Sequence, residues 1–180
     1  MESKPFIFGV ATSGDNFTDR EKETARLLSN FQHGVNTVLI SPRRWGKTSL
    51  VQKVCRLTQS DKLKIVYLDI FLCRSDGDFY NAFAAAVLKQ TSSKWDEWVE
   101  NAKLFLSRIS PRISLGPDPM SDFSISLELN PKSDDIDEIL QLPEKIAQKK
   151  GINIVVCIDE FQQIAEFKDS KMFQKRLRSV

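Results

Sequence analysis

The residues best suited to chemistry lie between Ser41 and Ser49, in the run Ser-Pro-Arg-Arg-Trp-Gly-Lys-Thr-Ser. This run matches the phosphate-loop (Walker A) pattern Gly-x₄-Gly-Lys-Ser/Thr, except that Ser41 stands where the first glycine belongs. Gly46 lets the backbone curl so that N–H groups point at phosphate oxygens, and the following helix start adds partial positive charge. Lys47 is expected to reach the β- and γ-phosphates, and the Thr48 hydroxyl to bind Mg²⁺. The sequence therefore predicts a site for ATP with Mg²⁺.

Four more residues complete the predicted loop, namely Pro42, Arg43, Arg44 and Trp45. The roles of the two arginines stay open: they neutralise the triphosphate, contact a partner, or lie in solvent. Trp45 is expected to pack against the edge of a sheet rather than to stack on a base. Together with Ser41 and residues 46–49, these four are the candidates for contact with the nucleotide.

Two carboxylates, Asp159 and Glu160, follow the most apolar segment of the chain. Ligands of open α/β sheets bind at the carboxyl ends of strands, so both should face the phosphate loop if the strands run parallel. Asp159 would then hold the Mg²⁺ shell, and Glu160 would orient and deprotonate the attacking water. The alternative is a helix N-cap, since an acidic residue before the Phe161 helix would stabilise any protein. The phosphate loop upstream favours the catalytic interpretation.

Apolar periodicity and capping residues predict the elements that would position these groups. Strands are expected at Asn36–Ile40, Lys64–Phe71 and Ile152–Ile158, and helices at Arg20–Gln32, Lys47–Leu57, Asp76–Thr91, Lys94–Ile109, Ser133–Lys150 and over a last amphipathic, basic segment from Phe161 to beyond Leu177. Thr18 or Asp19 would cap the first helix, Gly34 would stop it, and Pro143 should break or kink the fifth.

One segment differs from the rest: along 112–129, apolar residues alternate with Ser and Glu around a Gly-Pro-Asp-Pro turn. This pattern predicts a β-hairpin with one buried face and one wet face. Elsewhere strands alternate with helices, which favours an α/β fold with a mainly parallel sheet.

The composition excludes several classes of protein. Of the 180 residues, 41% are hydrophobic and 28% are charged, which is typical of a soluble globular protein and too apolar for disorder. The net charge of +2 gives no strong electrostatic footprint for nucleic acid. We find no signal peptide, no run of about 18 apolar residues that could span a membrane, and no Cys/His spacing typical of a metal site. We therefore expect a soluble, cytoplasmic protein with free thiols.

At these motifs the chain resembles the AAA+ superfamily, and within it the archaeal-type ATPases related to the STAND nucleotide switches. Pro42–Leu50 looks like the family's phosphate loop, and Ile158–Gln162 looks like its acidic (Walker B) strand. Phe17–Glu21 is similar to the segment, commonly apolar-Gly-Arg-Glu, that precedes the family's first helix and lies near the adenine. The resemblance adds Phe17 and Thr18 to the nucleotide-binding candidates, with Asp19 in place of a family glycine.

The resemblance implies a P-loop NTPase fold of three layers, α/β/α, in which the segment 112–129 is an inserted hairpin. Family members continue after the acidic strand with a sensor strand, a helical lid and often a DNA-binding or effector domain. None of these precedes Val180, so we expect the N-terminal part of a longer protein, or a truncated form of one, with an incomplete core and little activity alone. A protein or DNA partner would bind beyond Val180, and a full-length homo-oligomer is compatible with the family.

Three functions stay open. The first is an ATPase or ATP-driven switch that uses Glu160 for hydrolysis. The second is a P-loop small-molecule kinase, against which stand the adjacent Asp159 and Glu160 and the lack of an Arg-rich lid segment between the motifs. The third is a binding module with a structural nucleotide, supported by the basic last helix, although a charge run is usually a solvated face. The motifs favour the first.

The order of the strands distinguishes the first two functions. In an AAA+ type sheet the sensor strand lies between Asn36–Ile40 and Ile152–Ile158, which should then be about 10 Å apart, two strand spacings. Lys64–Phe71 should pair with Ile152–Ile158 instead. A hydrogen-bonded ladder between Asn36–Ile40 and Ile152–Ile158 would favour the kinase.

Overall fold

A computed structural model describes residues 20–42, 45–92 and 133–179 of the chain. The chain divides into two compact units, Met1–Leu63 and Lys64–Val180, which we describe separately. Several predicted features lie outside the described residues, namely the helix 94–109, the hairpin 112–129, and the candidates Phe17, Thr18, Arg43 and Arg44.

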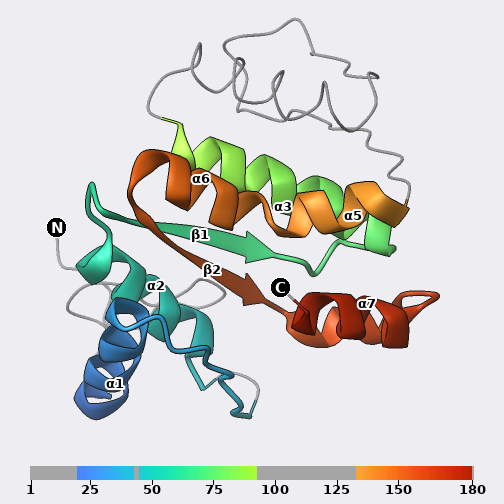
Figure 1. Ribbon diagram of the computed structural model, residues 1–180. Helices are drawn as coiled ribbons and strands as arrows, with labels where there is room; N and C mark the ends of the chain where they lie inside the picture. Colours follow the sequence, from blue (N-terminus) through green and yellow to red (C-terminus); the bar gives the residue numbers. More distant parts are fainter. Residues whose placement is uncertain (1–19, 43–44, 93–132, 180) are drawn as a thin grey trace, which may run out of the picture. The chain divides into compact units, whose positions relative to one another are not determined.

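The first unit is a pair of packed helices, α1 (Glu21–Gln32) and α2 (Lys47–Thr58), close to their predicted bounds (Figure 1). Buried Leu27 of α1 meets Leu50 and Val54 of α2, and further apolar side chains pack at the margin. Leu50 and Val54 are four residues apart, so one face of α2 supplies both contacts.

The predicted end of α1 is confirmed. Gly34 follows the helix with φ 65°, a conformation that L-residues with a side chain rarely adopt. The left-handed turn brings the N–H of Val35 to the carbonyl of Asn30, with a donor–acceptor distance of 2.9 Å. This bond satisfies a carbonyl that the helix end would otherwise leave without a partner.

The second unit is built on a sheet of two strands, β1 (Leu63–Asp69) and β2 (Asn153–Asp159), which run parallel and are hydrogen-bonded neighbours (Figure 1). Just past the end of β1, the N–H of Ile70 donates to the carbonyl of Asp159 over 3.3 Å, so both strands end at the same level. The predicted pairing of these two segments is therefore confirmed.

The prediction of a buried strand at Asn36–Ile40 is wrong. Within the described residues this segment belongs to no helix or strand, and Val38 and Ile40 are 83% and 91% exposed. An apolar run becomes a strand only when a neighbouring strand pairs with its backbone, and the described sheet consists of β1 and β2. The predicted 10 Å separation from β2 stays a prediction, as does the three-layer arrangement.

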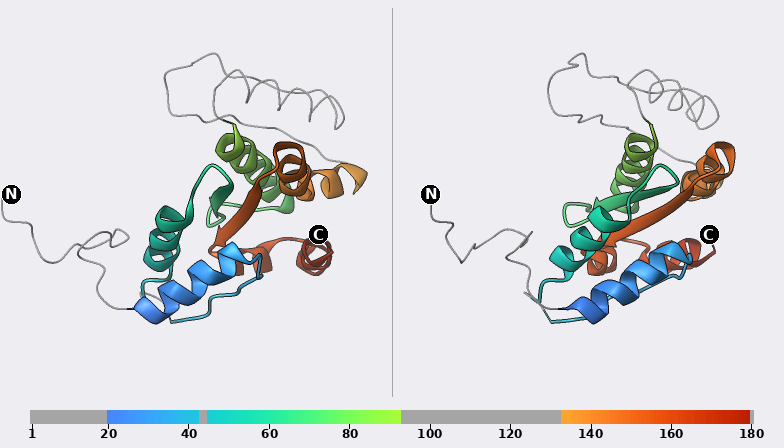
Figure 2. Two further views of the ribbon diagram at one scale, coloured as in Figure 1. Left: turned by 60° about the vertical axis from the view of Figure 1, so that its left-hand side comes forward. Right: turned by 90° about the vertical axis from the view of Figure 1, so that its left-hand side faces the viewer.

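Three helices of the second unit, α3 (Asp76–Thr91), α5 (Ser133–Leu140) and α6 (Leu142–Lys150), pack against one face of the sheet (Figures 1 and 2). The bounds of α3 are those predicted. The predicted break at Pro143 is also confirmed, because this residue lies in the first turn of α6, where a missing N–H costs no hydrogen bond.

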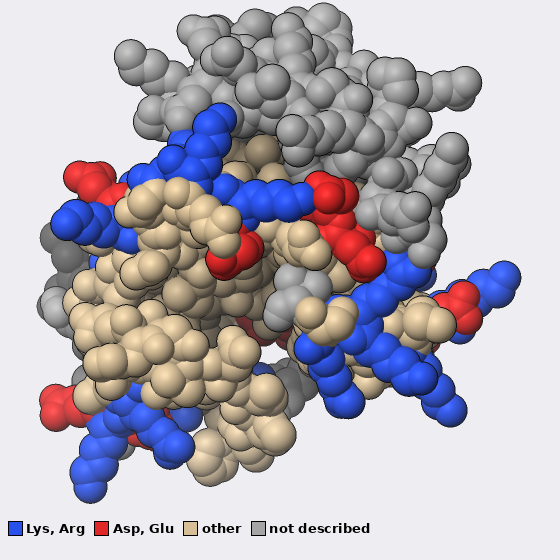
Figure 3. All heavy atoms as spheres, viewed as in Figure 1, with Lys and Arg blue, Asp and Glu red and all other residues tan. Residues whose placement is uncertain are grey.

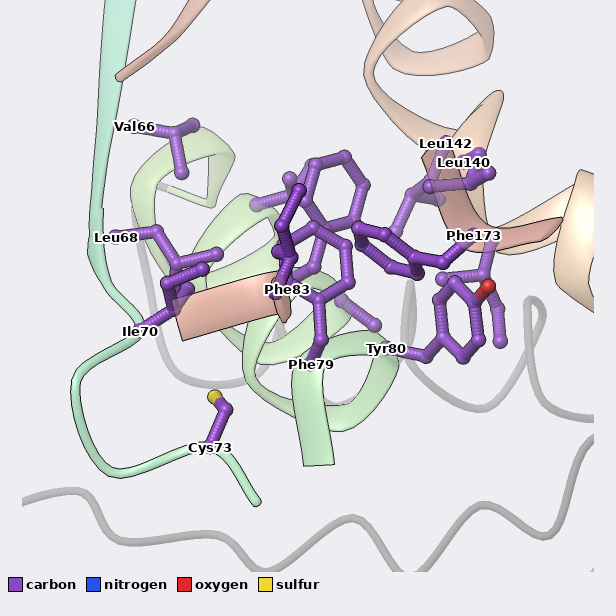
Figure 4. Packing of buried hydrophobic residues seen from close by; sticks show 14 of the residues in the cluster. Val66, Leu68, Ile70, Cys73, Phe79, Tyr80, Phe83, Leu140, Leu142 and Phe173 are labelled. Atoms are coloured by element: carbon purple, nitrogen blue, oxygen red, sulfur yellow. The ribbon is translucent and has the colours of Figure 1, made fainter. Parts of the chain in front are cut away.

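The core between the sheet and the helices is aromatic (Figure 4). The ring of Phe79 on α3 stacks on Phe83 at a centroid distance of 5.6 Å and meets Phe173 edge-on at 4.8 Å. Phe167 meets Phe173 edge-on at 5.2 Å. Burial raises the pKa of Tyr80 to about 12, so its hydroxyl stays protonated in this core.

The last segment is not the single helix that we predicted. It consists of the 3₁₀ helix η2 (Phe161–Glu166) and the α-helix α7 (Ser170–Arg178), with extended backbone at Phe167. In one continuous α-helix, Ile164 and Phe173 would point about 180° apart, since successive residues turn by about 100°. Breaking the helix lets Ile164, Phe167 and Phe173 all enter the same core.

The opposite side of α7 carries its charge. Lys171, Lys175 and Arg178 are exposed, and their spacing of four and three residues places them on one face, away from buried Phe173. In the space-filling view, Lys and Arg side chains gather over this helix (Figure 3). Among the described residues, no helix combines the length and apolarity needed to cross a membrane.

The aromatic core yields a first prediction. Phe173→Ala should lower the free energy of unfolding by about 3–5 kcal/mol, because it removes a buried ring that contacts three other rings. The exposed Phe161 on neighbouring η2 offers a control, and Phe161→Ala should change stability by about 0.5 kcal/mol or less. Urea unfolding measures both, and equal losses would contradict the core described above.

Candidate functional site

The residue directly before α2 has a left-handed backbone. Gly46 has φ 69° and ψ 28°, in the left-handed region, and it immediately precedes the first helical residue, Lys47. Its carbonyl accepts the first bond of the helix, from the N–H of Leu50 at 2.9 Å. A helix leaves the N–H groups of its first turn without acceptors inside the helix, so this turn can receive an anion.

The start of α3 shows the contrast within the same chain. There the hydroxyl of Ser75 accepts from the N–H of Asp78, and the Asp78 carboxylate accepts from the N–H of Ser75, which forms a capping box. The start of α2 has no side-chain cap. Gly46 at this position has no side chain with which to cap the helix.

Lys47 lies across the loop that precedes it. Its ammonium Nζ is 3.1 Å from the carbonyl oxygen of Ser41 and 3.5 Å from that of Pro42, both of which accept from it. Thr48 is half-buried and Ser49 is buried at the next two positions of α2. The structure thus places the carbonyls of Ser41 and Pro42 beside the Lys47 ammonium.

Arg20 is a contact of this loop that we had not predicted as one. Its guanidinium Nη1 donates to the carbonyl of Trp45 at 2.8 Å, and its backbone has φ 67° at the start of α1. The Trp45 side chain is 65% exposed, so the prediction that it packs against a sheet edge is wrong. The contact fixes the carbonyl just before Gly46, while the indole stays in solvent.

The acidic turn after β2 is held by neutral donors. The Oδ1 atom of Asp159 accepts from the N–H of Glu160 at 2.9 Å, and its Oδ2 atom accepts from the hydroxyl of Tyr67 at 2.5 Å. Sequence reasoning missed Tyr67, which lies on β1 among apolar neighbours. The predicted pairing of the two strands indicated that some residue of β1 would lie near Asp159. The register that makes this residue Tyr67 was not predictable from the sequence.

Glu160 itself adopts a left-handed conformation, with φ 55°, directly before η2. A side chain in this region costs about 1–2 kcal/mol, so the surrounding structure must hold it there. The N–H bond to Asp159 contributes to that, and the Glu160 carboxylate accepts from the amide Nε2 of Gln162. The alternative interpretation, a side-chain N-cap, is not observed, because no side chain caps η2.

Each of the two units contains an oxygen ligand of the kind that Mg²⁺ binds. Mg²⁺ prefers oxygen ligands and is usually held in nucleotide sites by one or two carboxylates together with substrate phosphates. Asp159 and the Thr48 hydroxyl offer oxygen atoms of this kind. Within residues 20–42, 45–92 and 133–179, no group of three or more His, Cys, Asp or Glu side chains could hold a metal ion.

A thiol nucleophile is not a competing interpretation for Cys73, the cysteine in the described core. Burial raises the pKa of the Cys73 thiol, and the nearby Asp78 and Asp69 carboxylates raise it further. A thiol must ionise to act as a nucleophile, and these shifts oppose ionisation.

The predicted site residues thus fall into two described groups. The phosphate-loop residues belong to the first unit, and Asp159 and Glu160 belong to the second. Each group has a defined internal geometry, with Lys47 bonded to loop carbonyls in one and Asp159 bonded to Tyr67 in the other.

Comparison with known proteins identifies a family. A family model described as an ATPase domain predominantly from Archaea matches residues 17–180. Neither the curated proteins nor the solved structures yield a significant match to the chain. The matched span includes both the loop at Gly46 and the acidic turn at Asp159, so the two groups described above lie within one conserved type of domain.

The loop geometry yields a second prediction. Gly46→Ala should lower the free energy of unfolding by about 1–2 kcal/mol, because alanine is strained at φ 69°. The added methyl group would meet no atom within 4 Å, so the loss would report on backbone conformation and not on a clash.

Gly77 in the first turn of α3 is the matched control, since its φ is not positive. Gly77→Ala should be neutral or stabilise by up to about 1 kcal/mol. Thermal or urea unfolding measures both variants, and a fully stable Gly46→Ala protein would mean that Gly46 does not need its left-handed conformation.

Proposed function

The chain belongs to the family of ATPase domains found predominantly in Archaea, and we propose that it binds ATP with Mg²⁺ and hydrolyses it, acting as an ATPase or a nucleotide-driven switch. One observation carries the proposal: a left-handed Gly46 leads into a helix that no side chain caps and that begins with Lys47. Backbone donors, the helix dipole and an ammonium then converge on one turn, which is the arrangement that binds phosphates.

Binding of the triphosphate would change the partners of Lys47. Its ammonium now contacts the carbonyls of Ser41 and Pro42, which carry only partial negative charge. Phosphate oxygens carry full negative charge and form shorter, stronger bonds to an ammonium. The remaining loop candidates, Arg43, Arg44 and Trp45, would lie along the phosphates or outside them, and Phe17 and Thr18 would lie near the adenine.

Hydrolysis requires a base for the attacking water, and we assign this role to Glu160. Its carboxylate would accept a proton from water as the water oxygen bonds to the γ-phosphorus. The bond from the γ-phosphorus to the bridging oxygen breaks, and ADP leaves with the bonding electrons. Bound Mg²⁺ would neutralise charge on the phosphates, with the Thr48 hydroxyl and Asp159 holding its shell.

The two alternative functions have less support. A small-molecule kinase would have β2 paired with the strand before the phosphate loop, whereas β2 pairs with β1 and residues 35–42 form no strand. A binding module with structural nucleotide rests on the basic face of α7, and such a face is usually solvated. Neither alternative gives Glu160 a role.

A third prediction tests nucleotide binding. Lys47→Ala should weaken ATP binding by about 30-fold, or about 2 kcal/mol, because it removes a charge-assisted contact to phosphate. Lys62→Ala, at an exposed lysine of the same unit, should leave the affinity unchanged. Calorimetric titration with ATP and Mg²⁺ measures both, and unchanged affinity of Lys47→Ala would reject the phosphate site.

A fourth prediction separates hydrolysis from binding. In the full-length protein, Glu160→Gln should keep ATP affinity and lose turnover by about 100-fold or more, because an amide does not accept the proton of water. Glu166→Gln, at an exposed position of η2, serves as the control and should hydrolyse ATP at the parental rate. Phosphate release measures the rates, and parental turnover in Glu160→Gln would show that Glu160 is not the base.

A further inference from the structure

The hydrogen bond between Tyr67 and Asp159 joins the two strands of the sheet at the acidic turn. The phenol oxygen lies 2.5 Å from Oδ2 of Asp159, and the two residues are 92 positions apart in the sequence. Both side chains are half-buried. A short bond from a neutral donor to a carboxylate belongs to the stronger class of hydrogen bonds.

The pleat of the strands explains why these two side chains meet. Successive side chains of a strand point to opposite faces of the sheet. Val66 and Leu68 on β1, and Ile70 just after it, face the aromatic core (Figure 4). On β2, the side chains that pack against the same core are Ile154, Val156 and Ile158. Tyr67 and Asp159 alternate with them, so both stand on the other face of the sheet.

The two donors reach different oxygens of the Asp159 carboxylate. An ionised carboxylate has about four lone-pair sites on its two oxygens. The Tyr67 hydroxyl uses one site on Oδ2, and the N–H of Glu160 uses one on Oδ1. One bond comes from β1 and the other from the turn after β2, so together they define the plane of the carboxylate.

We propose that Tyr67 is a positioning residue, which orients the Asp159 carboxylate for the Mg²⁺ that accompanies ATP. This inference rests on the proposed function. Partners of metal-binding carboxylates fix their orientation, and removing such a partner typically weakens metal affinity by about 10- to 100-fold. Without the phenol, Oδ2 would lose the donor that β1 supplies, and the carboxylate would be held less firmly in its plane.

Tyr67→Phe is the direct test, because it removes the hydroxyl and keeps the ring. The measurement is the affinity for a non-hydrolysable ATP analogue in calorimetry, first with EDTA and then over a series of Mg²⁺ concentrations. We expect the affinity for the analogue in EDTA to be unchanged. The Mg²⁺ concentration at which Mg²⁺ produces half of its full increase in affinity should rise about 10-fold or more. A role limited to packing would not move the Mg²⁺ dependence selectively.

Tyr80 provides the matched control, since it is the other of the two tyrosines in the chain. Its ring lies in the aromatic core and its contacts are with Phe79 and Phe173. Tyr80→Phe also deletes a phenol hydroxyl from the second unit, and it should leave the Mg²⁺ dependence at the parental value.

A double-mutant cycle with Asp159→Asn shows whether Tyr67 acts through Asp159. If it does, the variant with both changes should need no more Mg²⁺ than Asp159→Asn alone. Additive effects, or a parental Mg²⁺ dependence in Tyr67→Phe, would overturn the inference and leave the proposed function intact. So would a loss of affinity in EDTA, which would reveal a general structural defect. A parental protein that binds no nucleotide would overturn the proposed function and this inference together.

Discussion

The pairing of β1 with β2 is the contact on which the second unit depends. It joins segments that lie 92 residues apart at Tyr67 and Asp159, and it brings the carboxyl ends of both strands to one level through the bond from Ile70 to Asp159. One face of this small sheet packs against the aromatic core, and the side chains of Tyr67 and Asp159 lie on the other face. Stability and the candidate chemistry therefore share the same backbone bonds.

Burial of aromatic rings determines how the chain continues after the acidic turn. Ile164, Phe167 and Phe173 all belong to one core, although a continuous helix would turn them to different sides. The helical pattern breaks at Phe167, whose N–H still donates to the carbonyl of Ile164 and whose carbonyl accepts from the N–H of Ser170. Aromatic pairs in the core each contribute about 0.5–1.5 kcal/mol beyond their buried area. The break leaves α7 amphipathic, with Phe173 inside and its lysines in solvent.

Hydrogen bonds within the protein already hold the charged groups of the phosphate loop and of the acidic turn. Loop carbonyls accept from Lys47, the carbonyl of Trp45 is held by Arg20, and donors on both sides hold Asp159. Groups that are already oriented lose less entropy when a ligand binds, and electrostatic stabilisation depends on such order. Left-handed backbone occurs in both turns, at Gly46 and at Glu160.

The sequence by itself determined the features that depend on near neighbours along the chain. Ser75 and Asp78 cap α3, Gly34 ends α1 and Pro143 divides α5 from α6, because each acts on a backbone only a few residues away. The Gly-Lys-Thr loop could also be recognised from the sequence, and its roles in binding phosphate and Mg²⁺ stay proposals. Tertiary structure alone decided that Asn36–Ile40 forms no strand, that the last helix breaks at Phe167, and that Tyr67 meets Asp159. Each of these depends on partners distant in sequence, and neither composition nor periodicity encodes which distant backbone or side chain will be available to pair.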